Sequence, residues 1–171
     1  MAAKAASILY NVMKKAENIV NGSNYVIRNL QPSDYLSLLT MYRDFQPKNY
    51  TMGLPPTADT LRVQWLRNLL HEKLNLVALC GNRITGHASL IEIPKTDLCE
   101  YIVFVHQDYR GLGIGRKLTE ETCRQASMLG KKKIWLMVES SNQAAVRIYL
   151  HMGFRIKKVY GEVYEMILEQ D

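Results

Sequence analysis

The chain has 171 residues, of which 47% are apolar and 22% charged, a composition that fits a folded globular protein and excludes a disordered or fibrous one. A chain of this size buries roughly 70% of its extended surface, so one domain with a substantial core is expected. Lys and Arg number 22 against 16 Asp and Glu, and the charge of +6 suits a nucleic acid, an acidic membrane or a phosphorylated cofactor without choosing among them.

The cysteines and histidines narrow the class of protein. Cys80, Cys99 and Cys123 are odd in number and form no CxxC pair, which argues against a disulfide framework or a zinc site and for a reducing compartment. We therefore expect a cytoplasmic protein. The four histidines show no metal-ligand spacing, so no metal is expected. No apolar run approaches the ~20 residues that span a bilayer.

In residues 1–22, apolar side chains recur at helical spacing and predict an amphipathic helix that extends a main domain of residues 23–171. The segment lacks the continuous apolar stretch and the cleavage site of a signal peptide. One interpretation is a surface helix that packs on the domain or on a partner chain. The other is a membrane-surface or organelle-targeting helix, because Lys4, Lys14 and Lys15 lie in it.

Helix and strand patterns alternate up to residue 105. A strand at 25–30 precedes helices at 35–45 and 57–71, which flank a proline-bracketed loop at 48–54. The pattern then turns to strands at 74–80, 83–93 and 98–105, the first two forming a hairpin. The buried stripe of the second helix is predicted to be Leu61, Trp65, Leu66, Leu69 and Leu70.

After a glycine-rich turn, the pattern continues with a helix at 114–129, a strand at 133–138, a short helix at 142–152 and paired strands at 154–160 and 162–168. No repeat or internal linker interrupts it, so we expect one mixed α/β domain. The first of these helices is predicted to face inward with Ile114, Leu118, Thr122, Ala126 and Leu129.

The stretch QDYRGLGIGRKL, residues 107–118, places alternating glycines between a strand and a helix. Such a turn presents unpaired backbone N–H groups and the positive end of the helix dipole, which together bind phosphate. Arg110, Arg116 and Lys117 can add charge-assisted contacts. The plainer alternative is a tight turn whose glycines only permit close packing, but such a turn does not require the flanking cations.

Two phosphate-binding motifs do not fit this stretch. A P-loop requires GxxxxGK[ST], whereas Gly115 is followed by Arg116 and Lys117. The dinucleotide fingerprint requires GxGxxG, and the spacing of Gly111, Gly113 and Gly115 is one residue short. A hairpin also precedes the glycines, where a dinucleotide-binding fold would open with a βαβ unit.

Arg110, Gly113 and Gly115 meet the spacing R-x-x-G-x-G, and residues 142–154 follow N-x-x-A-x-x-x-Y-x-x-x-G-F. In these two motifs the chain resembles the GNAT superfamily of acyl-CoA-dependent N-acyltransferases, over residues 25–168. The resemblance implies a single α/β (α+β) GNAT-like domain, with a central mixed, mostly antiparallel sheet flanked by helices and here an additional N-terminal helix. It also implies an enzyme that uses acetyl-CoA to acetylate an amine.

The resemblance assigns cofactor-binding residues by position. Backbone groups of Phe104 and Val105 would hold the pantetheine arm where two strands splay apart, and Asn142 and Ala145 would border it on the other side. Tyr149 would reach the thioester sulfur. The pyrophosphate would lie on the loop formed by Arg110, Gly111, Leu112, Gly113, Ile114, Gly115 and Arg116.

Acyl transfer from a thioester requires a neutral amine, and an amine of pKa about 10 needs a base at neutral pH. Glu100 is the candidate base, because burial in the apolar strand CEYIVFV should raise its pKa. Related lysine acetyltransferases also place a catalytic glutamate on this strand. A solvent-facing or ion-paired glutamate is the alternative, and Glu92 is the second candidate. Tyr149 is the candidate acid for the leaving thiolate, the alternative being a core aromatic.

Direct transfer in a ternary complex is expected, with Cys99 and Cys123 as packing residues and not as nucleophiles. Residues 45–60 and the final hairpin should select the acceptor. The N-terminal half faintly resembles bacterial protein-lysine acetyltransferase domains, but a small amine, an amino acid or a peptide or protein lysine stays open, as does a homodimer. A non-catalytic acyl-CoA sensor is the alternative function. Nucleic acid is not expected, because the lysines at 131–133 fit a solvated turn.

Overall fold

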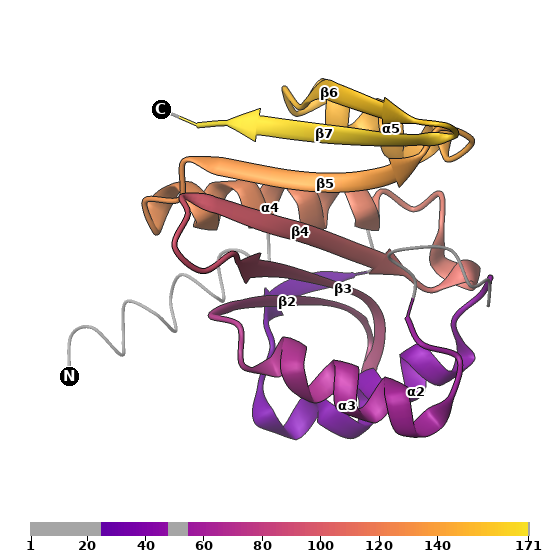
Figure 1. Cartoon of the computed structure of the whole chain (residues 1–171). Coiled ribbons are helices and arrows are strands. Elements are labelled where there is room, and N and C mark those ends of the chain that lie inside the picture. The colour runs from indigo at the N-terminus through magenta and orange to yellow at the C-terminus, as the bar shows by residue number, and fades with distance from the viewer. Residues whose placement is uncertain (1–24, 48–54, 171) are drawn as a thin grey trace.

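The computed structural model describes residues 25–47 and 55–170 (Figure 1). The predicted helix of residues 1–22 and the predicted loop at 48–54 lie outside the described residues. The helical elements are η1 Pro32–Asp34, α2 Tyr35–Asp44, α3 Asp59–Leu70, η2 Gln107–Tyr109, α4 Ile114–Met128 and α5 Gln143–His151. The strands are β1 Val26–Asn29, β2 Leu74–Cys80, β3 Arg83–Glu92, β4 Leu98–Val105, β5 Lys133–Glu139, β6 Arg155–Tyr160 and β7 Val163–Glu169. The predicted elements between 25 and 168 are all present, with ends that differ by at most two residues.

The strands form one 7-stranded sheet in the order β1-β2-β3-β4-β5-β7-β6. Every neighbouring pair is antiparallel except β4 and β5, which are parallel. Figure 1 shows α4 and α5 against one face of the sheet, called the α4 face below, and α2 and α3 against the other, called the α2 face. The predicted mixed, mostly antiparallel sheet flanked by helices is confirmed. Within the described ranges, no helix combines the length and the apolar character needed to cross a bilayer.

A separate core lies on each face of the sheet. On the α4 face, Leu118 of α4 packs with Ile134 of β5 and their neighbours. On the α2 face, Tyr42 of α2 packs with Phe104 of β4 and with residues of α3. Side chains along a strand alternate between faces, so β4 contributes to both cores, with Tyr101 in the first and Phe104 in the second.

β4 and β5 separate part-way along their length. Their ladder runs from Leu98 opposite Lys133 to Glu100 opposite Trp135 and then stops, although β4 continues to Val105. Each strand stays paired on its other side, β4 with β3 and β5 with β7 along its whole length. The sheet therefore opens into a wedge, whose closed end at Glu100 and Trp135 is called the apex below.

Two predicted core positions are wrong. Leu61 of α3 is 58% exposed, and Leu129, just after the last turn of α4, is 52% exposed. In place of Leu61, α3 buries Arg62, whose guanidinium donates to two backbone carbonyls just before the helix and pairs with Asp59 at 2.5 Å. Arg62 turns inward because these oxygen acceptors surround it and satisfy its buried donors.

A buried polar chain joins α2 to the sheet. The Tyr42 hydroxyl lies 2.5 Å from Nδ1 of His87, and Nε2 of His87 lies 3.0 Å from Oδ1 of Asn75. The Nδ2 of Asn75 donates to the carbonyls of Leu69 and Glu72, so its Oδ1 is the acceptor for His87. His87 thus carries its proton on Nε2 and accepts from Tyr42. Burial lowers the pKa of His87 to about 3, so the ring stays neutral.

Candidate active site

Glycines shape the loop that opens α4. Gly111 and Gly113 have φ angles of 79° and 80°, in the left-handed region that favours glycine. Gly113 is the N-cap of this 15-residue helix, whose first turn has no capping side chain and no acidic residue. Its first N–H groups and the helix dipole therefore favour an anion. The Tyr25 hydroxyl, 3.5 Å from where a Cβ of Gly113 would lie, is a further donor that the sequence does not single out.

At two other positions, glycine is explained by the space around it and not by its backbone angles. A Cβ on Gly86 of β3 would come within 3.0 Å of both Ile114 and Leu118, so glycine here lets the first turns of α4 lie close on the sheet. A Cβ on Gly115 would lie 3.6 Å from Val105, which is ordinary contact. Packing within the protein therefore does not require glycine at position 115. Because Gly115 has no side chain, the surface beside the N-terminus of α4 stays open.

The Arg110 side chain reaches the segment that follows α2. Its Nε donates to the Val105 carbonyl at 3.2 Å, a second N–H donates to the Gln46 carbonyl, and the guanidinium lies 5.3 Å from the ring centre of Phe45. Gln107 spans the same gap, accepting from the N–H of Gln46 and donating to the last carbonyl of α2, each at 3.0 Å. The sequence predicts the Arg110 side chain beside a pyrophosphate, whereas in the structure its guanidinium ties the loop to the end of α2.

Two cations stand in the first turn of α4. Arg116 pairs with Glu120 at 2.9 Å and lies 3.3 Å from Nε2 of His151 on α5, and Lys117 reaches Glu120 at 3.2 Å. The Arg116 and Lys117 side chains stay 57% and 46% exposed, so both can turn toward a ligand. The sequence does not single out His151, because only the packing of α5 against α4 brings it to this place.

Asn142 and Ala145 lie together at the start of α5. Asn142 is the N-cap of the helix, and its Oδ1 accepts from the N–H of Ala145 at 3.3 Å. Ala145 packs against the core of the α4 face. The Nδ2 donors of Asn142 have no partner among residues 25–47 and 55–170, so this cap keeps donors available beside the wedge.

Tyr149 of α5 is 7% exposed and packs in the core of the α4 face. Its ring centre lies 6.3 Å from that of Tyr101, edge to face, and 5.7 Å from that of Phe154. Burial raises the pKa of Tyr149, and the nearby Cys123 thiol raises it further, so the hydroxyl keeps its proton. In the described part of the chain this hydroxyl has no hydrogen-bond partner. Tyr149 is thus a core aromatic with an uncommitted donor.

Both cysteines of interest are buried in the same core, as the sequence predicts. Burial raises the pKa of Cys123 to about 12, and burial also raises the pKa of Cys99. A thiol that stays protonated is a poor nucleophile, so neither residue is suited to form an acyl-enzyme. Cys123 nevertheless lies closer to Tyr149 than the sequence suggests, since its thiol contributes to the raised pKa of that hydroxyl.

Tyr101 links β4 to the helix that follows the glycines. The Oγ1 of Thr119 donates to the Gly115 carbonyl at 2.8 Å, so its single hydroxyl proton is committed. The Tyr101 hydroxyl, 3.0 Å away, is therefore the donor to Thr119. This buried connection fixes the first turns of α4 relative to the strand that carries Glu100.

Glu100 alternates with Cys99 and Tyr101 and so points to the α2 face. It is half-buried, and burial raises its pKa with no other cause contributing. Among the residues that the structure describes, its carboxylate has no ion pair and no side-chain hydrogen bond. The carboxylate is therefore not the ion-paired glutamate of the alternative interpretation. An unpaired and partly desolvated carboxylate fits both a base and a glutamate on the solvent face of the strand.

Glu92, the second candidate base, lies in a different environment. Its carboxylate pairs with Lys131 at 2.9 Å, and this partner lowers the pKa of Glu92. It also points to the opposite face of the sheet from Glu100, which lies in register with the preceding residue of β3. In the predicted solvated lysine turn, Lys131 pairs with Glu92 and Lys133 with Asp97 at 3.0 Å, and the two lysine side chains stay 28% and 41% exposed.

The two candidate catalytic groups flank one stretch of β4. Glu100 lies on the α2 face, and Tyr149 packs on the α4 face against Tyr101, the residue that follows Glu100. Both therefore lie at the closed end of the wedge, where the backbone of β4 loses its partner on β5. No cluster of three or more metal-ligating side chains occurs in the described ranges.

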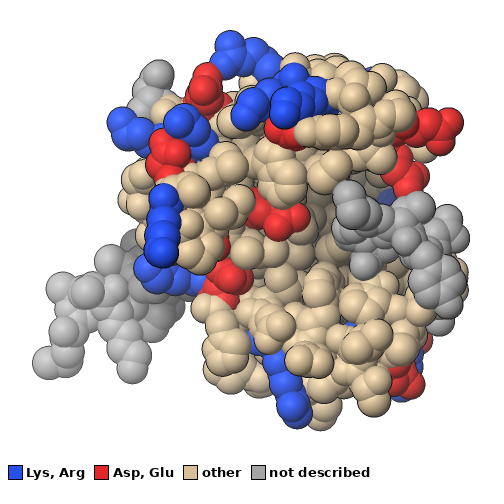
Figure 2. All heavy atoms as spheres, viewed as in Figure 1, with Lys and Arg blue, Asp and Glu red and all other residues tan. Residues whose placement is uncertain are grey.

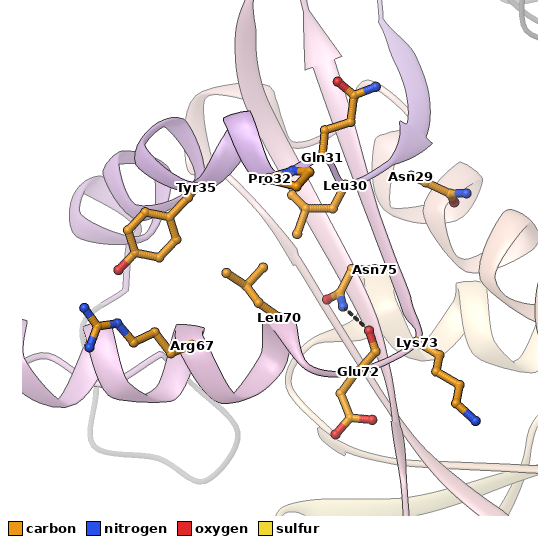
Figure 3. Close-up of a pocket in the computed structure, with 10 residues that line it drawn as sticks. All are labelled: Asn29, Leu30, Gln31, Pro32, Tyr35, Arg67, Leu70, Glu72, Lys73 and Asn75. Atoms are coloured by element: carbon orange, nitrogen blue, oxygen red, sulfur yellow. Dashed lines mark hydrogen bonds between the residues drawn. The ribbon is translucent and has the colours of Figure 1, made fainter.

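A cavity of about 620 Å³ lies away from the wedge, between η1, α3 and the start of β2 (Figure 3). Tyr35 and Leu70 point into it, and Asn75 connects it to the buried polar chain. Its lining residues are Asn29, Leu30, Gln31, Pro32, Tyr35, Arg67, Leu70, Glu72, Lys73 and Asn75. None of these is a predicted site residue, so the cavity is separate from the candidate active site.

Comparisons with known proteins agree with this geometry. The sequence model described as the acetyltransferase (GNAT) family matches residues 36–154. The L-amino acid N-acyltransferase MnaT of Escherichia coli is 35% identical over 75 residues, which are 42% of this chain and 44% of that protein. The chain thus spans less than half of that curated relative's length.

Solved structures of acetyltransferases have a similar fold. The structure of yncA from Salmonella typhimurium with its cofactor acetyl-CoA has a TM-score of 0.69 and 25% identity, covering 86% of this chain and 94% of that one. An acetyltransferase of the GNAT family from Streptococcus pneumoniae has a TM-score of 0.72 and 21% identity, covering 86% of this chain and 99% of that one.

Proposed function

Since this chain belongs to the acetyltransferase (GNAT) family, we propose that it moves the acetyl group of acetyl-CoA to a primary amine by direct transfer in a ternary complex. The wedge carries this proposal. Its ladder stops at Glu100 and Trp135, with an unpaired carboxylate on one face of β4 and an uncommitted Tyr149 hydroxyl on the other. The family uses acetyl-CoA, and the structural neighbour yncA holds it as its cofactor.

The residues around the wedge fit acetyl-CoA at both of its ends. The free N–H groups in the first turn of α4 suit a pyrophosphate, and Arg116 can turn toward it. Backbone groups of Phe104 and Val105 lie along the part of β4 that has lost its partner, and they would face the pantetheine amides as a strand does. The Asn142 donors would border the same arm. When bound, acetyl-CoA supplies a thioester whose carbonyl carbon is electrophilic.

The proposed reaction moves one proton on each side of the sheet. The acceptor amine approaches from the α2 face, and Glu100 takes its proton directly or through one water as the nitrogen–carbon bond forms. The carbon–sulfur bond breaks, and the negative charge that develops on sulfur is met by the Tyr149 hydroxyl. Tyr149 gives its hydroxyl proton to the sulfur and regains one from solvent, and Glu100 releases to solvent the proton that it took. The products are an amide and free CoA with its thiol restored.

The direction of the Glu100 pKa shift supports its role as base, whereas the raised pKa of Tyr149 makes its hydroxyl a weaker proton donor. A raised pKa brings the Glu100 carboxyl closer to neutral pH, where a base can both take and release a proton. Glu100 acts only when ionised, so kcat/KM should rise with pH as this carboxyl loses its proton. Tyr149, whose pKa is raised above the usual value for tyrosine, acts first as a hydrogen-bond donor to the developing thiolate.

The proposal is tested by measuring acetyl-CoA binding and acetyl transfer separately. Calorimetry with CoA and acetyl-CoA reports binding, and thiol release with a panel of amines, amino acids and lysine peptides reports turnover. We expect binding in the micromolar range, amine-dependent release of CoA and an N-acetylated product in the mass spectrum. The intact mass of the protein after incubation with acetyl-CoA alone should be unchanged, because direct transfer leaves no acyl-enzyme.

Two results would contradict the proposal. An absence of acetyl-CoA binding would remove the function, and binding without turnover of any amine would favour the acyl-CoA sensor. A mass increase of one acetyl group on a cysteine would leave the function intact and overturn direct transfer.

A further inference from the structure

The acceptor side of the proposed active site is bordered by the end of α2. Within the described ranges, the core under α2 and α3 contains residues of β2, β3 and β4 and no residue of β5 or β7. Figure 1 shows both helices against that half of the sheet. An acceptor that reaches Glu100 from the α2 face therefore lies over β5 and β7, beside the last strand that the helices cover.

Phe45 lies at this border. It follows α2 directly, is 5% exposed and packs edge to face on Phe104 of β4, with the ring centres 5.5 Å apart. At Phe104, β4 no longer has a partner on β5, because their ladder stops at Glu100. The end of α2 therefore lies over the open part of the wedge, on the face from which the acceptor amine would approach.

Side chains from the segment after β4 hold the end of α2 in this place. The Gln107 carboxamide accepts from the N–H of Gln46 and donates to the carbonyl of Asp44, each at 3.0 Å. The Arg110 guanidinium donates to the carbonyl of Gln46 and lies 5.3 Å from the ring centre of Phe45. Both backbone groups of Gln46 are thus bonded to the segment that leads into the glycine loop. The side chains of Gln107 and Arg110 with these three hydrogen bonds are called the α2 clamp below.

Arg110 also bonds to the last residue of β4. Its Nε donates to the carbonyl of Val105 at 3.2 Å. In a trans peptide the carbonyl and the N–H that follows it point in opposite directions, and the N–H of His106 bonds to the carbonyl of Thr85 on β3 at 2.9 Å. The Val105 carbonyl therefore points to the edge of β4 that β5 has left. Arg110 occupies this acceptor, so one side chain joins the wedge, the glycine loop and the end of α2.

The α2 clamp is distinct from the cations that suit a phosphate. Arg116 and Lys117 stand in the first turn of α4, where the free N–H groups are, and their side chains are 57% and 46% exposed. Gln107 carries no charge, yet it bonds to the same segment as Arg110. Figure 2 shows the α2 face, with basic side chains gathered over β6 and β7 at the top and mostly uncharged atoms in the middle. Attraction of a phosphate therefore does not explain why Gln107 and Arg110 both reach the end of α2.

From these contacts we propose that Gln107 and Arg110 are positioning residues that make the placement of α2 at the acceptor side depend on the glycine loop that holds acetyl-CoA. The loop holds the α2 clamp, and the clamp holds Phe45 on Phe104. The inference rests on the proposed acetyl transfer and adds two residues that act on it without contacting the reacting atoms. It gives the Arg110 side chain a role other than the pyrophosphate contact that the sequence predicts.

Loss of the α2 clamp should lower turnover more than cofactor affinity. β4 stays paired with β3 up to Val105, so the strand beside acetyl-CoA keeps its place without the clamp. The end of α2 is then free to shift against it, and a displacement of about 1 Å in such a site can lower the rate up to about 10²-fold. We therefore expect kcat/KM for the amine to fall about 10-fold in Arg110→Ala and in Gln107→Ala, with the Kd for CoA changed less than about 3-fold.

The test compares these two variants with three others. Arg110→Lys keeps a positive charge but not the planar fork that bonds to two carbonyls, so it should stay close to Arg110→Ala. Arg116→Ala removes a cation of the α4 N-terminus and should raise the Kd for CoA about 10-fold. Arg67→Ala, which removes an exposed arginine of α3 outside the clamp, is the control and should match the wild type.

Binding and turnover are measured separately in every variant. Calorimetry gives the Kd for CoA, thiol release gives kcat/KM for the amine, and thermal unfolding checks that the variant is folded. If Arg110→Ala does not fold, the milder changes Gln107→Ala and Arg110→Lys decide.

Hydrogen exchange tests the same inference without turnover. In the wild type, saturating CoA should slow amide exchange in residues 40–47 at least about 5-fold, because a bound loop holds the end of α2 through the clamp. Arg110→Ala and Gln107→Ala should bind CoA and lose this slowing, whereas Arg67→Ala should keep it. A residue that only supports the fold would change the exchange equally with and without CoA.

The outcomes separate this inference from the proposed function. If Arg110→Ala raises the Kd for CoA as much as Arg116→Ala does and Arg110→Lys restores it, Arg110 is a phosphate ligand and the inference is wrong. If CoA leaves the exchange at the end of α2 unchanged in the wild type, or if Gln107→Ala keeps the wild-type kcat/KM, the inference is wrong and acetyl transfer stands. If no amine releases CoA from acetyl-CoA, the proposed function fails and the inference fails with it.

Discussion

The two faces of the sheet at the wedge are built in different ways. On the α4 face, the candidate cofactor site consists of a continuous loop and two helix starts, and most of its donors are backbone N–H groups. On the α2 face, the candidate acceptor site consists of single side chains from β4, β5 and β7, brought together by strand register. The first kind of site leaves a spaced motif in the sequence, and the second kind leaves none.

The two faces also differ in the kind of ligand that each would recognise. A shared cofactor needs one backbone geometry, so its site is held by glycine conformations and helix caps that tolerate few alternatives. In the proposed function, an acceptor would be selected by side chains on the α2 face, which can change without disturbing the sheet. Substitutions on the two faces should therefore fall into two classes, those that change acetyl-CoA affinity and those that change chemistry or acceptor choice.

The largest effect is expected for Glu100→Gln on the α2 face. Removing a general base should lower kcat/KM about 10²- to 10⁴-fold, because the amide cannot take the amine proton. Below neutral pH the wild-type rate should fall as Glu100 gains a proton, and the variant should lose this dependence. Steady-state kinetics between pH 5.5 and 9 measures both.

Glu162→Gln, an exposed carboxylate in the turn between β6 and β7, is the matched control and should keep full activity. Calorimetry should give the same CoA affinity for both variants and the wild type. A Glu100→Gln protein with an unchanged pH profile would show that the base lies elsewhere, and the contrast between the faces would then lose its main support.

Tyr149→Phe tests whether the α4 face contributes chemistry as well as binding. The change removes one hydroxyl and leaves the ring against Tyr101 and Phe154. We expect kcat to fall by roughly 10²-fold, since the leaving sulfur loses its donor, with CoA affinity unchanged. Single-turnover measurements would isolate this step. Full activity of the variant would make Tyr149 a core aromatic only.

Gly113→Ala should weaken acetyl-CoA binding without changing chemistry at saturation. A residue with a Cβ at φ 80° is strained by about 1–2 kcal/mol, and relief of this strain would turn the N-cap of α4 away from its present geometry. The Kd for CoA should rise by about 10-fold, by calorimetry. Gly161→Ala has similar strain, at φ 58° in the β6–β7 turn, and should lower stability with Kd unchanged. Equal Kd values in both variants would refute a role of the α4 N-cap in binding.

The smallest effect concerns stability. Glu100 has a raised pKa in the folded chain, so between its unfolded value of about 4.3 and its folded value the native state binds more protons, and stability falls as pH rises through that window. Glu100→Gln removes this loss. Its melting temperature should exceed that of the wild type at pH 7, and the difference should shrink toward pH 4. A less stable variant at pH 7 would mean that the carboxylate has a stabilising partner.

Much of the fold can be predicted from this sequence, because the hydrophobic periods and the turn residues agree with each other. The element order, the hairpin of β2 and β3 and the helix after the glycines are confirmed. The inward stripe of α3 is wrong at one position, since a helical period alone allows Leu61 or Arg62 to turn inward and only the acceptors around Arg62 decide.

The two halves of the candidate site differ in how many of their residues can be predicted from the sequence. The α4 N-terminus and the carboxylate of Glu100 can be predicted, the first from a motif and the second from a charged residue in an apolar strand. The contact of Arg110 with the end of α2 cannot, because it joins segments 64 residues apart. Trp135 is missed for a similar reason, since only the register of β4 and β5 reveals its neighbour.

The separation of β4 from β5 has a consequence for the stability of the protein in the cell. Unpaired strand edges invite pairing with other chains, and here two such edges lie inside the sheet and not at its rim. A cofactor that fills the wedge would act as a missing strand, adding about 2.7 kcal/mol of stability at a concentration 100 times its Kd. The supply of CoA would then govern how long the chain escapes aggregation and proteolysis, as well as how fast it works.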